Sequence, residues 1–133
     1  MSGEMDLKTI LQSLSPCLLD DTYVFCTVPD ANYGDYAEAA PIATFQEPEG
    51  LTLVITQERA DGLSLGYEGL FSCISLQVHS SLESVGLTAV VAGKLAVYEI
   101  SANMIAGYYH DHLFVPQAKA SEALELLSNL NNL

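Results

Sequence analysis

The chain has 133 residues, 50% of them hydrophobic, and its 17 acidic residues against four lysines and arginines give a formal net charge of -13. This length favours one domain or two very small ones, and the apolar content argues against disorder. So few basic residues argue against binding to nucleic acid or to anionic membranes. There is no apolar run of roughly 20 residues and no signal-peptide pattern, so we expect a cytoplasmic protein.

The cysteines, Cys17, Cys26 and Cys73, are odd in number and form no C-x-x-C pair. This pattern does not support a disulfide framework or a structural zinc site. Cys26 and Cys73 lie in apolar, strand-like runs, so we interpret them as small buried hydrophobic residues. We expect no cofactor.

In the first half, a helix is predicted over residues 6–14, because apolar residues recur at positions 7, 10, 11 and 14 and Asp6 can cap its start. Residues 23–28 are rich in β-forming side chains and predict a strand that ends at Pro29. Residues 29–41 combine turn residues with acids and predict a loop without a convincing helix.

Two further strands, residues 42–45 and 51–56, are predicted to form a hairpin around a Pro-Glu-Gly turn. Residues 57–63 can form a short helix. Glycines then loosen the chain, so we place the boundary between an N-terminal unit and a C-terminal unit here, at residues 1–67 and 68–133.

The second half alternates strands and helices more clearly. Residues 71–78 predict a strand that buries the face of Ile74, Leu76 and Val78. A helix over residues 82–98, strands over 100–107 and 112–115, and a helix over 119–130 follow.

This β-α-β-β-α order predicts an α+β, ferredoxin-like fold: an antiparallel sheet with helices on one face. A fourth strand is missing after the last helix. The open sheet edge therefore needs a strand from the first half, such as residues 23–28, or one from another subunit.

The stretch from Ser80 to Glu83 matches S-x-x-E, which predicts a capping box at the start of the second-half helix. Free N–H groups at such a start, placed at a sheet edge, favour an anion, although a plain helix start explains the motif equally well. Gly86 can allow close approach of a ligand or backbone, and Gly93 on the same face indicates helix packing.

Two polar clusters remain. His110 and His112 share a face and can bind zinc or copper, whereas the neighbouring tyrosines and Asp111 suit a cation or an amine; a polar connection is the plainer interpretation. Glu47 and Glu49 flank a proline and can do acid–base work or form a solvated turn. No P-loop, G-x-S-x-G, H-E-x-x-H or G-x-G-x-x-G occurs, so we do not expect an enzyme.

Three stretches, TFQEPEGLTLVI (44–55), LQVHSSLESVGLTAVVA (76–92) and NMIAGYYHDHLFVP (103–116), resemble a family of small bacterial ACT-domain proteins of unknown function. The resemblance covers nearly the whole chain and implies two ACT-like units in tandem, the first degenerate. The tandem ACT arrangement is similar to the regulatory part of aspartate kinases and to CASTOR-type arginine sensors. It implies a regulatory module that binds an amino acid and has no catalytic activity.

The resemblance also implies a ligand site with two walls and a third element from the other unit. The first wall is His79, Ser80, Ser81, Leu82, Glu83, Val85, Gly86, Leu87 and Thr88; the second is Ile105, Ala106, Gly107, Tyr108, Tyr109, His110 and Asp111; the third element is Glu47, Glu49 and Gly50.

An amino acid needs donors for its carboxylate, which a helix start offers, and acceptors for its ammonium, which Asp111, Glu47 and Glu49 offer. With one arginine in the chain, a dicarboxylic ligand would be hard to neutralise. We therefore expect a neutral or cationic amino acid or a related amine, a homodimer or higher homo-oligomer, and an effector protein that the sequence does not name. The alternative is a structural protein that assembles through ACT-like edges around vestigial sites.

Overall fold

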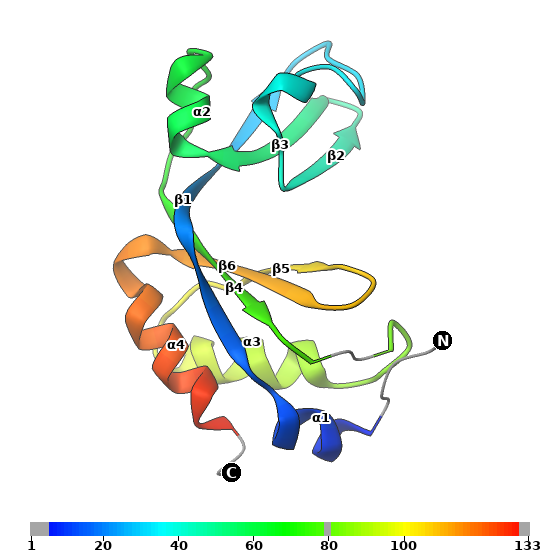
Figure 1. The fold of residues 1–133 in the computed structure, drawn as a ribbon, viewed down its shortest axis with the longest axis vertical. Helices are drawn as coiled ribbons and strands as arrows, with labels where there is room; N and C mark the ends of the chain where they lie inside the picture. Colours follow the sequence, from blue (N-terminus) through cyan, green and yellow to red (C-terminus); the bar gives the residue numbers. More distant parts are fainter. Residues whose placement is uncertain (1–5, 79–80, 131–133) are drawn as a thin grey trace. The chain divides into compact units, whose positions relative to one another are not determined.

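The computed structural model describes residues 6–78 and 81–130, which form two compact units (Figure 1). The larger unit combines the residues up to Asp20 with those from Ser72 onward, and the smaller unit is Asp21–Phe71. Contacts within the structure thus group the N-terminal residues with the second half of the chain. The expected boundary between two ACT-like units, at residues 67 and 68, stays a prediction.

Strand β1 (Pro16–Val28) contributes to both units. In the smaller unit its residues 23–28 pair antiparallel with β3 (Gly50–Thr56). In the larger unit β1 neighbours β4 (Phe71–Leu76), and the N–H of Gln77 donates to the carbonyl of Ser15 at 3.0 Å. The strand therefore begins at Pro16 rather than Tyr23, and its first residues cover the sheet edge that lacked a partner.

The larger unit has the predicted β-α-β-β-α order, with the strands arranged β1-β4-β6-β5. Its hairpin pairs Asn103 with Phe114 and Ala106 with Asp111. After β4 the elements are α3 (Leu87–Val97), β5 (Asn103–Ala106), β6 (Asp111–Pro116), the 3-10 turn η2 (Gln117–Lys119) and α4 (Ala120–Ser128). The α+β ferredoxin-like fold is confirmed.

Helix α1 (Leu7–Ser13) precedes this unit's strands and is also confirmed. The Asp6 carboxylate accepts from the hydroxyl of Thr9 at 2.7 Å and from its N–H at 3.3 Å. The hydroxyl hydrogen bond is the main reason that the pKa of Asp6 lies below its usual value.

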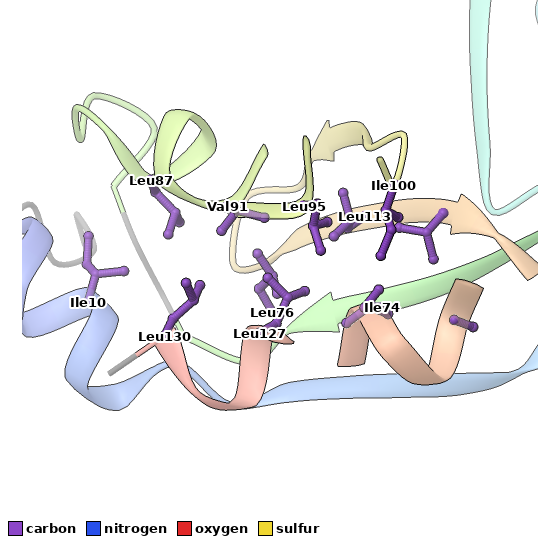
Figure 2. Close-up of a cluster of buried hydrophobic side chains, with 13 residues drawn as sticks. Ile10, Ile74, Leu76, Leu87, Val91, Leu95, Ile100, Leu113, Leu127 and Leu130 are labelled. Carbon is purple, nitrogen blue, oxygen red and sulfur yellow. The ribbon is translucent and has the colours of Figure 1, made fainter. Parts of the chain in front are cut away.

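One hydrophobic core joins the three helices to one face of the larger unit's sheet (Figure 2). Leu95 of α3 and Leu127 of α4 face Leu76 of β4, and each is at most 1% exposed. Burying one such leucine stabilises a fold by about 1.5–3 kcal/mol, so this contact is a principal source of stability. Figure 2 labels its main members: Ile10, Ile74, Leu76, Leu87, Val91, Leu95, Ile100, Leu113, Leu127 and Leu130.

Strand β4 confirms the predicted burial of Ile74, Leu76 and Cys73, and both of its faces are buried. Cys73 and Ser75, which point the other way from Ile74 and Leu76, are 0% and 4% exposed. β4 is also a central strand, with neighbours β1 and β6 along its two edges. Burial raises the pKa of the Cys73 thiol to about 11, which keeps it neutral.

Helix α3 begins at Leu87, so the predicted start at residue 82 and its capping box are wrong. Leu82 and Glu83 form a turn, in which the N–H of Glu83 donates to the hydroxyl of Ser81 at 3.1 Å. Gly86 caps the helix with φ of +102°, a left-handed conformation that interrupts helical geometry. His79 and Ser80 lie outside the described residues.

The smaller unit has the strand order β2-β3-β1, and its β2–β3 hairpin, β2 being Ala43–Glu47, is confirmed with Glu47 opposite Gly50. Helix α2 (Gln57–Gly62) confirms the predicted short helix. The described segment between β1 and β2 contains one 3-10 turn, η1 (Ala37–Ala39), in place of a full helix. This short turn explains the degenerate character of the smaller unit. Its core gathers Val24, Cys26, Ala31, Ala39, Leu51, Leu53, Ile55 and Ala60.

Two glycines of α3 allow a matched test of its start. Gly86→Ala should lower the free energy of unfolding by about 1–3 kcal/mol, because φ is +102° and a Cβ would lie 3.0 Å from Cδ2 of Leu7. Gly93→Ala should instead raise it by about 0.5–1 kcal/mol, since nothing lies within 4 Å of its Cβ. Urea unfolding measures both, and equal effects would contradict the left-handed cap.

Candidate functional site

A cavity of about 560 Å³ lies in the larger unit, between the start of α3 and the β5–β6 hairpin. We call it the α3 cavity. The segment before α3 and its first turn form one side, and the hairpin turn forms the other. The lining residues are Ser81, Leu82, Ser84, Val85, Gly86, Leu87, Thr88, Ala89, Ala106, Gly107, Tyr109, His110 and Asp111.

The two walls expected from the sequence meet in this cavity, although they lie far apart along the chain. Of the expected wall residues that the structure describes, Glu83, Ile105 and Tyr108 are not among the lining residues. Sequence reasoning missed Ser84 and Ala89. The misplaced helix start explains both, because Ser84 was assigned to a helix interior and Ala89 lies in the true first turn.

The third expected element, at the β2–β3 turn, belongs to the smaller unit and does not line the α3 cavity. Its residues have local roles. The Glu47 carboxylate accepts a short hydrogen bond from the Thr52 hydroxyl. Gly50 has φ of +150°, and a Cβ there would lie 2.6 Å from the carbonyl oxygen of Val28. Participation of Glu47, Glu49 and Gly50 in ligand binding stays a prediction.

A tight turn presents the hairpin side of the cavity. The N–H of Gly107 donates to the carbonyl of His110 at 2.9 Å. A Cβ at Gly107 would lie 2.8 Å from that oxygen and 3.2 Å from Cε1 of His112, so this turn requires glycine. The rings of Tyr108 and Tyr109 meet edge to face at 5.1 Å, and both are largely exposed.

The described residues that line the α3 cavity include a carboxylate but no lysine or arginine to balance it. Of these described residues, Asp111 has the sole carboxylate. Burial raises the pKa of Asp111, and the nearby His112 opposes this only in part. Within the described chain, Nδ1 of His110 is buried and has no hydrogen-bond partner.

The cavity also has donors. The first N–H groups of a helix have no intrahelical acceptor, and the helix dipole places partial positive charge there. In α3 these are the amides around Thr88 and Ala89, both of which line the cavity. The arrangement can therefore hold an ammonium group at Asp111 and a carboxylate at the helix start.

No three side chains among His, Cys, Asp and Glu gather in the described part of the chain to hold a metal ion. No helix there is long and apolar enough to cross a membrane.

Comparison with known proteins defines the class. Residues 2–72 match one model of the ACT domain and residues 71–129 match another, so the chain belongs to the ACT-domain family and carries two such domains in tandem. A search of curated proteins finds no match.

Among solved structures, the chain is similar to a protein of unknown function from Vibrio cholerae, described as a possible transport protein. That protein is 54% identical over 94% of this chain and 95% of its own, with a TM-score of 0.85. A protein from Agrobacterium tumefaciens is 17% identical over 89% of each chain, with a TM-score of 0.73. The regulatory subunit of aspartate kinase from Thermus flavus is 14% identical over 86% of this chain and 95% of its own, with a TM-score of 0.61, and shares the fold.

The buried carboxylate predicts a pH-dependent stability. The folded pKa of Asp111 lies above the ordinary value of 3.8, so its ionisation destabilises the fold as the pH rises through the folded pKa. Asp111→Asn should therefore be more stable than the parent at pH 7, and the difference should vanish as the pH falls below about 4.

Thermal unfolding from pH 3.5 to 8 measures this difference. Asp20→Asn is the matched control, because Asp20 is an exposed aspartate of the same unit and its loss changes the net charge equally. A pH-independent effect of Asp111→Asn, or the same effect in Asp20→Asn, would contradict the burial argument.

Proposed function

We propose that the chain is a regulatory module that binds a neutral or cationic amino acid, or a related amine, in the α3 cavity. ACT domains are typically regulatory ligand-binding modules, and the chain carries two of them. The observation that carries the proposal is the meeting of two distant segments around one cavity of about 560 Å³. That volume lies within the range typical of small-molecule sites.

The lining chemistry selects the ligand class. The ligand's carboxylate accepts from the free N–H groups at the start of α3. Its ammonium lies against Asp111, which has lost part of its hydration to burial and gains from a cationic partner. Leu82 and Val85, 66% and 82% exposed, offer apolar surface to the ligand's side chain.

A dicarboxylic ligand fits this cavity poorly. A second carboxylate would meet no lysine or arginine among the described lining residues. The whole chain adds to the effect, because its formal net charge of -13 repels anions and attracts cations. Aspartate and glutamate should therefore bind more weakly than neutral or basic amino acids.

The proposal includes a regulatory rather than a catalytic role. Ligand binding would act on an effector protein through a homodimer or higher homo-oligomer in the cytoplasm. The tandem ACT composition supports this role, as does the shared fold with a protein that is itself a regulatory subunit.

A second candidate function is assembly without a ligand. It is favoured by α3, whose outward residues are apolar except for Thr88 and Lys94: Val97 at its end is 77% exposed, and Ala89, Gly93 and Ala96 are exposed too. A helix that is apolar on all sides is usually buried, so this face suits another subunit. Strand β5, at the end of the strand order, offers an edge for the same purpose.

A thermal-shift screen of the full chain against the twenty amino acids and simple amines separates the two functions. A ligand at 100 times its Kd should add about 2.7 kcal/mol of stability and raise Tm by several degrees. Aspartate as the best ligand would contradict the charge argument and retain the site. No stabilisation by any compound would favour assembly.

A matched pair of variants locates the binding. Ala89→Leu should abolish the shift, because Ala89 lines the cavity and leucine would fill it. Ala96→Leu adds the same side chain to an exposed position of the same helix outside the cavity and should retain the shift. Leucine is a good helix former, so both variants should keep α3. Equal loss in both would place the ligand elsewhere.

A further inference from the structure

A second cavity, also of about 560 Å³, lies wholly within the smaller unit. It is formed by β1 and by the chain segment that follows α2 and leads to β4. We call it the aromatic hollow. It contains none of the residues expected from the sequence or assigned to the α3 cavity.

Two phenylalanines line the hollow at right angles to each other. Phe25 of β1 and Phe71 at the start of β4 have ring centroids 5.2 Å apart and an interplanar angle of 75°. In this arrangement the edge of one ring meets the face of the other, and both rings line the same hollow. Both rings are half-buried, so they are packed in place while part of each stays open.

The third aromatic wall, Tyr67, is fixed by its hydroxyl. The hydroxyl donates to Oδ1 of Asp61 at 2.7 Å and accepts from Nε2 of Gln57 at 3.2 Å. The bond to Asp61 is the main reason that the pKa of Tyr67 is raised, so the phenol stays protonated. The ring therefore serves the hollow as a neutral aromatic surface.

Two glycines line the hollow, and one of them lies against a ring. A Cβ at Gly69 would lie 3.4 Å from Cε2 of Phe71, so a side chain there would lie against that ring. A Cβ at Gly66 would have nothing within 4 Å and would project into open space. Both glycines line the hollow, and neither has the positive φ that would require glycine for backbone reasons.

The charge around the hollow is negative. Glu68 supplies a carboxylate to its wall, and none of the described lining residues is basic. In the sequence from Asp21 to Phe71 the one basic residue is Arg59, whose guanidinium donates to the carbonyl of Glu38 at 3.1 Å. Aromatic faces beside a carboxylate attract a cation, and a weakly hydrated cation with apolar substituents gains most.

We propose that the aromatic hollow is a second ligand site, which binds a small organic cation with alkyl groups on its nitrogen, such as a quaternary ammonium. Phe25, Tyr67 and Phe71 provide the π-faces and Glu68 the countercharge. The inference does not depend on the proposed function, because the two cavities share no residue.

An NMR titration of the ¹⁵N-labelled full chain with choline, at constant ionic strength, tests the site. The amides of Gly66 and Gly69 should shift saturably, while those of Gly86 and Gly107 in the α3 cavity stay unchanged. The uncharged isostere 3,3-dimethylbutan-1-ol should bind roughly tenfold more weakly, because it lacks the cation–π attraction. Equal binding of the isostere, or no saturable shift of Gly66 and Gly69, would overturn the proposal.

Paired variants distinguish the contribution of the hollow's own carboxylate and rings to choline binding from the general effect of losing a charge or an aromatic ring. Glu68→Gln should weaken choline binding by about two- to fivefold, because Glu68 is an exposed charge, and Glu58→Gln, an exposed glutamate of the same unit outside the hollow, should not. Phe25→Leu should weaken it more, by roughly up to thirtyfold, whereas Phe45→Leu, which changes a 71% exposed ring outside the hollow, should not. Because Phe25 is half-buried, Glu68→Gln is the decisive variant if Phe25→Leu fails to fold. Equal affinities of Glu68→Gln and Glu58→Gln would overturn the assignment.

Discussion

The structure depends on one strand that contributes to both units of the chain. β1 pairs with β3 through residues 23–28 in the smaller unit and neighbours β4 in the larger unit. A β-α-β-β-α segment alone leaves a sheet edge with unpaired backbone groups, which costs free energy when buried and invites aggregation when exposed. The first residues of β1 remove that edge, so the larger unit requires residues from both ends of the chain.

The α3 cavity follows from where α3 begins. A helix starting at residue 82 would turn the segment before Gly86 into a regular helical surface. The left-handed backbone of Gly86 prevents a helix from continuing through this segment. Instead, the hydroxyl of Ser81 accepts a hydrogen bond from the N–H of Glu83 and stabilises a local turn. The irregular segment then supplies Ser81, Leu82, Ser84 and Val85 as one side of the cavity, and the first free amides of α3 lie beside them.

Local patterns in the sequence predicted much of the fold, and competing signals explain the failures. The 3.6-residue period of α1 with its Asp6 cap, and the Pro-Glu-Gly turn of the β2–β3 hairpin, are strong local signals, and both predictions are confirmed. β1 was predicted too short, because Pro16, Asp20 and Asp21 resemble a loop, and only pairing distant in sequence makes them a strand. The capping box predicted a helix start at residue 82, but the left-handed backbone of Gly86 interrupts helical geometry there, so the helix begins at Leu87. The walls of the α3 cavity were expected from a family resemblance, whereas nothing local in the sequence indicated that Phe25 and Phe71 meet.

The two cavities use one negative charge each in different surroundings. Burial raises the pKa of Asp111, so a cation that reaches it restores interactions lost with water, and charge dominates the binding energy there. Glu68 is exposed, and water and salt screen its attraction. Binding in the aromatic hollow must then come mainly from the rings of Phe25 and Phe71, which favour apolar, weakly hydrated cations. The two proposals together would let an acidic chain that attracts cations in general distinguish between a hydrated ammonium at one site and an alkylated one at the other.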